Sequence, residues 1–220
     1  MEKIIHQIWV GTYRIPKRES NYVELMRSMN NDWNYILWTD ESVKKLNMPE
    51  NIKKSYDYYY KVGHFVHASD VLRLFLVYEF GGIYLDIDFE PRNKISTILP
   101  LEDYDAFICY HHDCGPTPHT LPNNVFGSKK NGKLFTYIIN NIREGNMNGP
   151  YEFANISKRY LELDIKDTEI LGENGLLETL DKNNIFYYSY IDFHENICNH
   201  QALYSHSPVN VIKFKNNDYE

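Results

Sequence analysis

A helix, a pair of glycines and a short acidic strand follow one another without interruption in the first half of this sequence. Apolar residues recur at helical spacing over residues 63–80, and the Gly-Gly pair that follows stops the helix. Residues 83–88 then alternate, with aliphatic side chains on one face and Asp86 and Asp88 together on the other. This order predicts a helix packed beside a strand whose end carries two carboxylates.

The remaining pattern predicts an α/β fold with a mixed central sheet. Strands are expected over residues 3–10 and 34–38, and a short helix over residues 39–46. Later strands are expected at 106–110, 121–128, 185–190 and 209–214, and later helices at 133–142, 150–161 and 176–180. Because strand, helix and strand alternate early, we expect a Rossmann-like nucleotide-binding layer. No linker or repeat interrupts the chain, so residues 1–220 are expected to form a single domain.

Charge and cysteine content restrict the partners and the compartment. The formal net charge is −7, which makes DNA or RNA a poor partner. Cys109, Cys114 and Cys198 form no C-x-x-C pair, which is typical of a reducing compartment. The first ten residues lack a long apolar run, and no run approaches the roughly 20 residues that cross a bilayer. We therefore expect a cytoplasmic protein, and a position at a membrane surface is compatible with the sequence.

The two aspartates of residues 83–88 are candidates for a metal site. Asp86 and Asp88 would repel each other on one face unless a cation lay between them. Mn²⁺ or Mg²⁺ fits, because these ions take oxygen ligands and also bind diphosphate oxygens. The competing interpretation is two solvated aspartates at a strand end, since D-x-D alone is common.

A second charged pair lies on the preceding helix. Asp70 and Arg73 are three residues apart and share one face of the helix. A surface ion pair is one interpretation. The helix around them is strongly apolar, however, and a carboxylate and a guanidinium can also hydrogen-bond sugar hydroxyls or phosphate oxygens.

Three other interpretations compete. Residues 109–114 with His119 hold two cysteines and up to three histidines that could bind zinc, although their spacing is not that of a standard finger. A haloacid-dehalogenase-like phosphatase would use Asp86 as its nucleophile, but Phe89-Glu90-Pro91 follows the motif instead of the usual Thr or Gly. A sugar-binding or inactive transferase-like module is the non-enzymatic alternative.

Three blocks taken together resemble one family. IHQIWVG at residues 5–11, ASDVLR at 68–73 and GGIYLDID at 81–88 resemble the D-x-D region of family 32 glycosyltransferases. That family includes initiating α-1,6-mannosyltransferases of the yeast type and enzymes of capsular polysaccharide biosynthesis. The catalytic domains of clostridial glucosylating toxins are similar in the same blocks. The resemblance covers about the first 90 residues.

The resemblance implies a GT-A fold, a retaining mechanism and a divalent cation, Mn²⁺ or Mg²⁺. It implies that a hexose is transferred from a nucleotide-diphosphate sugar to an acceptor glycan. A UDP-sugar is the favoured donor, because the region of Trp9 resembles the uracil pocket of the toxin domains, and GDP-mannose is the alternative.

The resemblance also assigns roles to single residues. Trp9 would stack on the donor base, unless it is a core tryptophan, and Asp88 would ligate the metal directly. Asp70 and Arg73 would contact the donor sugar, and Asp86 the ribose or sugar and a metal-bound water. Catalysis is expected to depend on Asp70, Arg73, Asp86 and Asp88. The further positions expected on the donor side are Ile8, Val10, Gly11, Gly82, Tyr84, Ile87 and Asn124.

A third metal ligand is expected from the C-terminal region. His206 is the first candidate and His200 the second. The family often has a Ser-Trp shortly after its histidine, and this sequence lacks the tryptophan. One imidazole among oxygen ligands suits Mn²⁺.

Overall fold

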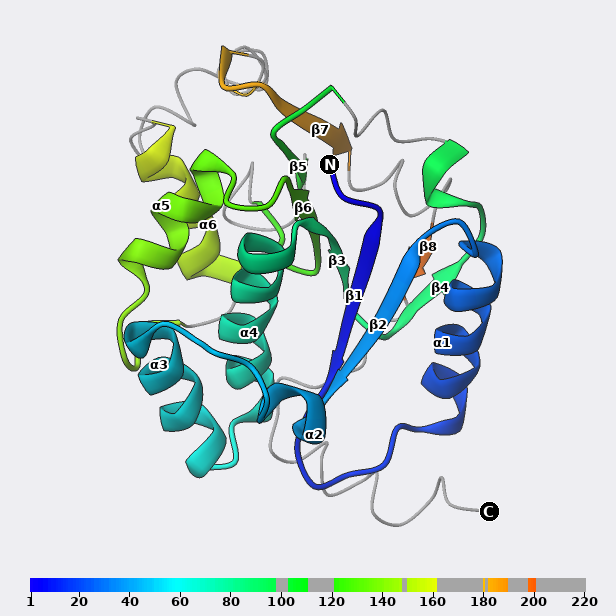
Figure 1. The fold of residues 1–220 in the computed structure, drawn as a ribbon, viewed down its shortest axis with the longest axis horizontal. Coiled ribbons are helices and arrows are strands. Elements are labelled where there is room, and N and C mark those ends of the chain that lie inside the picture. Colours follow the sequence, from blue (N-terminus) through cyan, green and yellow to red (C-terminus); the bar gives the residue numbers. More distant parts are fainter. Residues whose placement is uncertain are drawn as a thin grey trace.

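The central sheet of the computed structural model has six strands, in the order β2-β1-β3-β6-β5-β7 (Figure 1). The strands are β1 (Ile4–Trp9), β2 (Asn34–Thr39), β3 (Gly82–Leu85), β5 (Ala106–Tyr110), β6 (Val125–Ser128) and β7 (Ile185–Ser189). β1 runs parallel to β2 and β3, β5 runs parallel to β7, and β6 is antiparallel to β3 and β5. The structure describes residues 1–97, 103–110, 121–147, 150–161, 180, 182–189 and 198–200.

Helices cover both faces of this sheet. They are α1 (Lys17–Met29), α2 (Asp40–Val43), α3 (Glu50–Lys61), α4 (Phe65–Phe80), α5 (Lys133–Asn141) and α6 (Pro150–Tyr160), with a 3-10 turn at Ile95–Thr97. α4 lies against the middle of the sheet, and α3, α5 and α6 gather around it on the left of Figure 1, while α1 lies on the right. Two short strands, β4 (Phe89–Pro91) and β8 (Cys198–His200), form a small antiparallel ladder.

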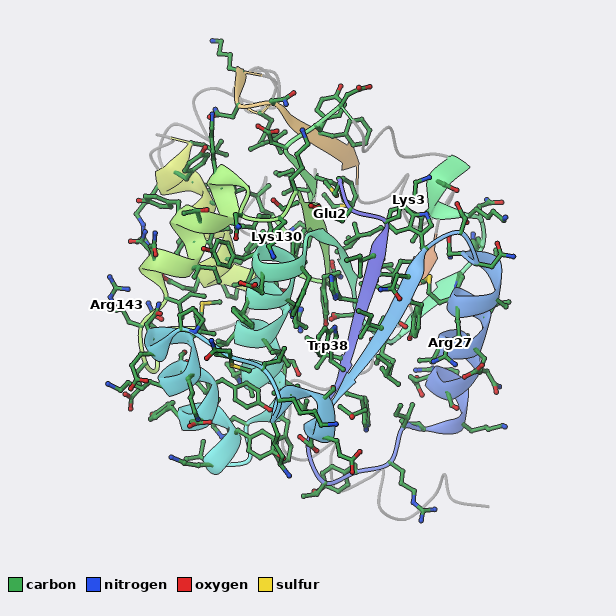
Figure 2. All side chains as sticks on the ribbon, in the orientation of Figure 1. Glu2, Lys3, Arg27, Trp38, Lys130 and Arg143 are labelled. Carbon is green, nitrogen blue, oxygen red and sulfur yellow. The ribbon has the colours of Figure 1, made fainter. Side chains whose placement is uncertain are left out.

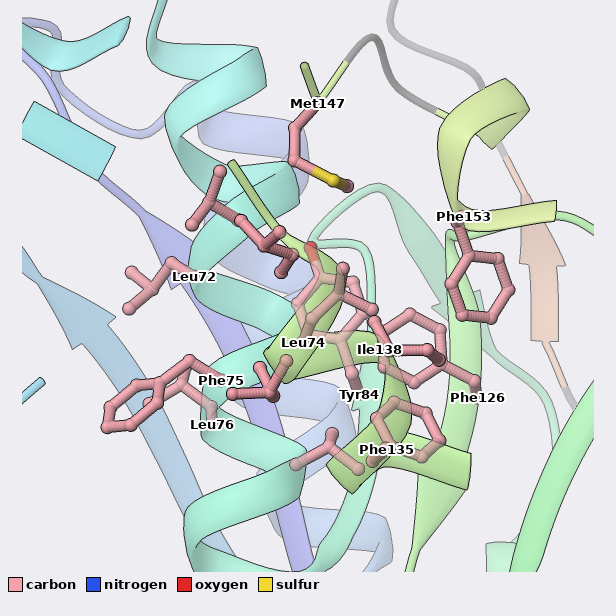
Figure 3. Close-up of a cluster of buried hydrophobic side chains, with 14 of the residues drawn as sticks. Leu72, Leu74, Phe75, Leu76, Tyr84, Phe126, Phe135, Ile138, Met147 and Phe153 are labelled. Carbon is pink, nitrogen blue, oxygen red and sulfur yellow. The ribbon is translucent and has the colours of Figure 1, made fainter. Parts of the chain in front are cut away.

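Alternate residues of the strands enter two separate apolar layers. Tyr84 and Phe126 join the layer under α4, which Figure 3 shows with α5 and α6 packed against it. Ile83, Leu85 and Phe107 join the other layer, together with Met26 of α1. Both faces of β3 are therefore buried, as expected for a strand in the middle of a two-sided sheet.

The acidic strand is shorter than the sequence predicts. β3 ends at Leu85, and Asp86 and Asp88 lie in the turn that leads to β4. The N–H of Asp86 still bonds to the carbonyl of Asn124, 2.9 Å away, in the register of the β3–β6 ladder. The turn follows it, where the N–H of Phe89 bonds back to the carbonyl of Asp86 at 3.4 Å. The alternation of residues 83–85 is confirmed, and its extension as a strand to Asp88 is wrong.

The α/β class and the mixed sheet are confirmed, and the other predicted elements match within a few residues. The sequence analysis missed α1, α3 and the β4–β8 ladder. The strand expected at 209–214 and most of the helix expected at 176–180 lie outside the described residues. None of the described helices is both long and apolar enough to span a bilayer.

Candidate functional site

The turn between α4 and β3 brings two parts of the candidate site together. α4 ends at Gly81, whose φ of 69° few other residues adopt, and its N–H caps the carbonyl of Val77 at 2.9 Å. The chain then reverses into β3, so the middle of α4 lies beside the carboxyl end of that strand. Asp70 and Arg73 of α4 thereby meet Asp86, which follows β3.

Arg73 is the centre of this cluster. Its Nη2 lies 3.2 Å from Oδ1 of Asp70, and its Nη1 lies 3.2 Å from Oδ1 of Asp86. Nη1 also donates to the carbonyl of Asn123 at 2.7 Å, and Nε donates to the carbonyl of Ser69 at 3.3 Å. The side-chain amide of Asn123 donates to Oδ1 of Asp70 at 2.8 Å, which closes the network.

Asp86 is fixed through both its side chain and its main chain. The Tyr84 hydroxyl donates to Oδ1 of Asp86 at 2.5 Å. The main-chain N–H of Asp86 donates to the carbonyl of Asn124, and its carbonyl accepts from Nε2 of Gln7 at 3.0 Å. The Tyr35 hydroxyl holds Gln7 in turn, 2.6 Å from Oε1. The position of Asp86 is therefore set by β1, β2, β3 and the segment before β6.

Among the residues that the structure describes, the cluster around Arg73 holds more negative than positive charge. Arg73 is 5% exposed, Asp70 3% and Asp88 6%, so this is no surface ion pair. Burial lowers the pKa of Arg73, but Asp86, Tyr84, Asp70 and Asp88 outweigh it and raise the pKa above its usual value. The Tyr84 pKa is raised chiefly by burial, and its ring lies 4.7 Å below the guanidinium carbon. Three carboxylates thus surround one guanidinium.

This excess charge fits a divalent cation. Uncompensated buried carboxylates are costly, and two more positive charges would balance the cluster. Asp86 and Asp88 supply the hard oxygen ligands that Mg²⁺ and Mn²⁺ prefer. Within the described residues no group of three or more His, Cys, Asp or Glu gathers in metal-binding geometry.

The residues expected at the donor base lie at the carboxyl end of β1, next to the end of β2. Trp9 is partly exposed, and its indole N–H donates to the carbonyl of Tyr13 at 2.7 Å, so it is not a core tryptophan. Gly11 has a φ of 109°, and its N–H points to the Asp40 carboxylate, 3.1 Å from Oδ2 and 3.3 Å from Oδ1. The Tyr60 hydroxyl donates to Oδ1 of Asp40 at 2.9 Å.

Three of the residues predicted on the donor side, Gly82, Ile8 and Ile87, pack inside the protein. Gly82 begins β3, at the end opposite the carboxylates, and a Cβ there would collide with the main chain of Ile4. Close packing of β1 on β3 therefore accounts for this glycine, and the structure places it away from the donor side. Ile8 and Ile87 are buried, at 5% and 6% exposure.

The expected third metal ligand falls largely outside the described residues. His206 lies there, as do Cys114 and residues 111–113 of the zinc interpretation. Cys109 lies on β5 and packs into the apolar layer with Phe107. The main chain of His200 pairs with Phe89, the residue after Asp88, so β8 passes directly beside the D-x-D turn.

Asp40 and Gln7 reach the site although the sequence analysis assigned neither, and Asn123 joins it beside Asn124, which the sequence analysis expected on the donor side. Asn123 belongs to a pair of asparagines before a strand, a weak signal shared with ordinary turns. Asp40 is the first residue of α2, where an acidic residue is expected for the helix alone. Their roles depend on contacts between distant segments, which periodicity does not reveal.

The fold defines a class of protein. The α/β fold with its mixed six-strand sheet is a GT-A glycosyltransferase fold. The solved structure "PaToxG Glycosyltransferase" superimposes with a TM-score of 0.60 at 18% identity, over 88% of this chain and 83% of that chain. The predicted GT-A fold is confirmed.

Sequence comparison narrows this class. Residues 16–105 match the family described as "Glycosyltransferase sugar-binding region containing DXD motif", so the chain carries that region with Asp70, Arg73, Asp86 and Asp88 in it. Inositol phosphoceramide mannosyltransferase 3 of Schizosaccharomyces pombe is 30% identical over 161 residues, 72% of this chain. Uncharacterized glycosyltransferase L373 of Acanthamoeba polyphaga mimivirus is 29% identical over 63% of this chain. The chain spans 41% and 54% of these relatives' lengths. The resemblance seen in the sequence is confirmed.

Proposed function

We propose that this protein is a retaining, metal-dependent glycosyltransferase that transfers a hexose from a nucleoside-diphosphate sugar to an acceptor glycan. The observation that carries the proposal is the buried cluster at the end of β3, where three carboxylates surround Arg73 beside the carboxyl ends of β1 and β2. In open α/β sheets, ligands bind outside the carboxyl ends of the strands. The matching D-x-D region and the mannosyltransferase relatives support the same class of reaction.

The residues of the cluster have distinct roles in this proposal. Asp70, held by Arg73 and Asn123, accepts hydrogen bonds from sugar hydroxyls. Arg73 fixes Asp70 and Asp86 in one arrangement, which positions the donor before reaction. Asp88 and Asp86 would hold Mn²⁺ or Mg²⁺, which when bound neutralises the charge of the diphosphate leaving group. His206 or His200 is proposed as the third ligand.

The cytoplasmic location and the glycan acceptor stay predictions of the sequence. The donor nucleotide is proposed to be uridine or guanosine diphosphate. Retention at the anomeric carbon is proposed from the resemblance alone, and NMR of the first-formed product measures it directly.

A turnover assay tests the proposal. Purified protein is incubated with UDP-glucose, UDP-galactose, UDP-N-acetylglucosamine or GDP-mannose, and released nucleoside diphosphate is measured with Mn²⁺ and with EDTA. We expect release from one donor only with the metal. The Asp88→Asn variant should lose at least about 100-fold of this rate, the range reported when a transition-state charge contact is removed.

Asp32→Asn is the matched control, because Asp32 is exposed and lies before β2, at the end of the sheet opposite the site. Its rate should equal that of the wild type. Full activity of Asp88→Asn, or equal rates with EDTA, would refute the metal-dependent mechanism. Donor binding without turnover and without metal dependence would favour the sugar-binding module. An aspartyl-phosphate on Asp86 would favour the phosphatase.

A further inference from the structure

A hollow lies on α3, where this helix meets the turn between α5 and α6. Its volume is about 290 Å³, and its lining comes from α3, the residue after it and the turn: Lys54, Asp57, Tyr58, Lys61, Val62 and Glu144. None of these residues belongs to the cluster around Arg73 or to the ends of β1 and β2. Tyr58 is 46% exposed and Val62 58%, so the hollow presents apolar surface to solvent.

Hydrogen bonds fasten the two walls of the hollow to each other. The side-chain amide of Asn51 on α3 donates to the carbonyl of Ile139 at 2.8 Å. The Ser55 hydroxyl, one turn further along α3, donates to the carbonyl of Arg143 at 3.3 Å. Within the turn, the N–H of Arg143, which Figure 2 labels, donates to Oδ1 of Asn146 at 2.8 Å. The hollow is therefore formed before a ligand arrives, and binding need not order its walls.

The Tyr58 ring is the aromatic surface of the hollow and is itself held in place. Its centroid lies 5.2 Å from that of Tyr59 at an interplanar angle of 78°, so the edge of one ring meets the face of the other. Gly145 of the turn also lies close, because a Cβ at this position would be 3.6 Å from Cε1 of Tyr58. The ring thus keeps one orientation while nearly half of the residue stays open to solvent.

The charges around this ring cancel. Two lysines and two acidic residues line the hollow, so its side chains carry no net charge. Among the described residues, the side chains of Lys61 and Glu144 make no hydrogen bond or ion pair. An anion would be repelled by Asp57 and Glu144, and a cation by the two lysines. A neutral sugar fits, because its hydroxyls donate to carboxylates and accept from ammonium groups, while its C–H face covers an aromatic ring.

The hollow lies near the sugar-binding end of the candidate site. The Tyr59 ring, next to Tyr58, stacks on the His67 ring of α4 with centroids 5.2 Å apart. His67 precedes Asp70 by three residues, about one helical turn of 5.4 Å. The pKa of Tyr59 is raised, first by burial and also by the charge of Asp70, which agrees with this closeness. Three steps of about 5 Å each separate Tyr58 from Asp70, so an oligosaccharide of a few units spans them.

We propose that this hollow is a secondary binding site for one neutral sugar unit of the acceptor glycan. The unit stacks on Tyr58, and Lys61 and Glu144 hydrogen-bond its hydroxyls. That the glycan is the acceptor rests on the proposed function, whereas the binding of a neutral sugar rests on the hollow itself. An acceptor that reaches from the cluster around Arg73 to the hollow gains this second contact and a shorter one does not, so the site favours long chains.

Oligosaccharide binding in the absence of donor and metal tests the site. The probes are neutral oligosaccharides of glucose, galactose, mannose and N-acetylglucosamine, with a heparin oligosaccharide as the anionic comparison. Each is titrated into the isotope-labelled protein, and amide signals are followed by NMR. We expect one or more neutral probes to shift the signals of residues 54–62 and 144, and the heparin probe to leave them unchanged.

Variants of the exposed tyrosine separate stacking from other contacts. Tyr58→Ala should weaken binding of the neutral probe at least about fivefold, as expected when an aromatic anchor is removed. Tyr58→Phe keeps the ring and should stay within about twofold of the wild type. Tyr151→Ala is the control, because Tyr151 is 66% exposed on α6 and does not line the hollow. If Tyr58→Ala does not fold, judged by circular dichroism, Lys61→Ala replaces it and should weaken binding about threefold.

The outcomes separate this inference from the proposed function. Binding of no neutral probe, or of heparin alone, overturns the sugar site and leaves the transferase proposal intact. Equal losses in Tyr58→Ala and Tyr151→Ala also overturn it, as does an equal loss in Tyr58→Phe, because the ring would then not be the contact. Binding that depends on Tyr58, combined with no turnover of any donor, keeps the sugar site but overturns the proposed function and the acceptor role with it.

Discussion

Two buried polar groups lie along the same helix, α4, and they differ in charge balance. In the middle of α4, Arg73 faces three carboxylates. Just past its end, His6 of β1 is fully buried, with Nε2 2.8 Å from the carbonyl of Gly81 and Nδ1 3.0 Å from the indole nitrogen of Trp38. Because an indole N–H only donates, Nδ1 of His6 accepts and Nε2 carries the proton.

The histidine is neutral and has a partner for each ring nitrogen, and its ring lies 6.0 Å from that of Trp38, labelled in Figure 2, and 6.2 Å from that of Phe80. A neutral ring with both nitrogens bonded needs no ligand to balance its charge. The cluster of Arg73 is also largely buried, but its described residues carry excess negative charge, which a cation and a bound substrate can relieve. A buried polar group with balanced charge indicates a structural role, and one with excess charge indicates a binding site.

Replacing Arg73 should have the largest effect on stability. Arg73→Met leaves three buried or half-buried carboxylates without their cation, so unfolding free energy should fall by about 3–5 kcal/mol. Urea denaturation measures the loss. Arg27→Met is the control, because Arg27, labelled on α1 in Figure 2, has a half-exposed side chain that contacts the Tyr35 ring and Glu24. The control should lose no more than about 1 kcal/mol. Similar losses in both variants would remove the contrast between the buried cluster and the surface.

The histidine end should respond to pH instead. Burial lowers the pKa of His6 from 6.5 to about 4, against the opposing effect of its bond to Gly81. The unfolded chain therefore binds more protons between these two values, and stability should fall as the pH falls from about 6.5 to about 4, by about 3 kcal/mol from this residue. Denaturation midpoints across this range give the slope. A His6→Gln variant should be less stable at neutral pH and should show a flatter slope. An identical slope in wild type and variant would contradict the account of a neutral buried histidine.

Removing the Tyr84 hydroxyl should have a smaller effect within the charged cluster. Tyr84→Phe keeps the ring that Figure 3 shows packed near Phe126, but Asp86 loses one donor and keeps Arg73. The expected loss is about 1.5 kcal/mol in urea denaturation, typical of a hydrogen bond to a charged group. Tyr13→Phe, at a 38% exposed tyrosine, is the control and should change stability little. A loss no greater than that of the control would show that Arg73 alone orients Asp86.

The smallest effect should have the opposite sign. Asp88→Asn removes one of the three carboxylates, so the metal-free protein should gain about 1 kcal/mol. Melting with EDTA and with Mn²⁺ tests this, because the wild type should be stabilised by the metal and the variant should not. A loss of stability in EDTA would mean that the cluster is balanced as it stands, and the contrast with His6 would fail.

The sequence predicted the parts of this fold that depend on local pattern. The apolar period of α4 and the glycines after it were sufficient for the helix, its end and the start of β3. α1 escaped prediction because only Glu19, Val23 and Met26 of its thirteen residues are buried, so its apolar stripe is narrow. The turn after Asp86 escaped because the alternation of residues 83–88 continues through it, and only the backbone bond from Phe89 to Asp86 marks the reversal.

The candidate site likewise has residues that local sequence pattern predicts and residues that depend on contacts between distant segments. Asp70, Arg73, Asp86 and Asp88 could be proposed from spacing and resemblance, and the structure brings them together. Asn123 and Asp40 join through contacts across 53 and 29 residues of chain. Such contacts exist only once the sheet order is known, so no reading of single segments could supply them.

The burial of α4 has a consequence for how the site moves. Every residue from Asp70 to Val77 is buried, so this stretch has no exposed face from which it could fray. Its amide hydrogens should exchange with deuterated solvent only when the whole domain opens. The helical side of the site is then as rigid as the protein is stable, and any rearrangement that admits or releases a substrate belongs to the loops around it.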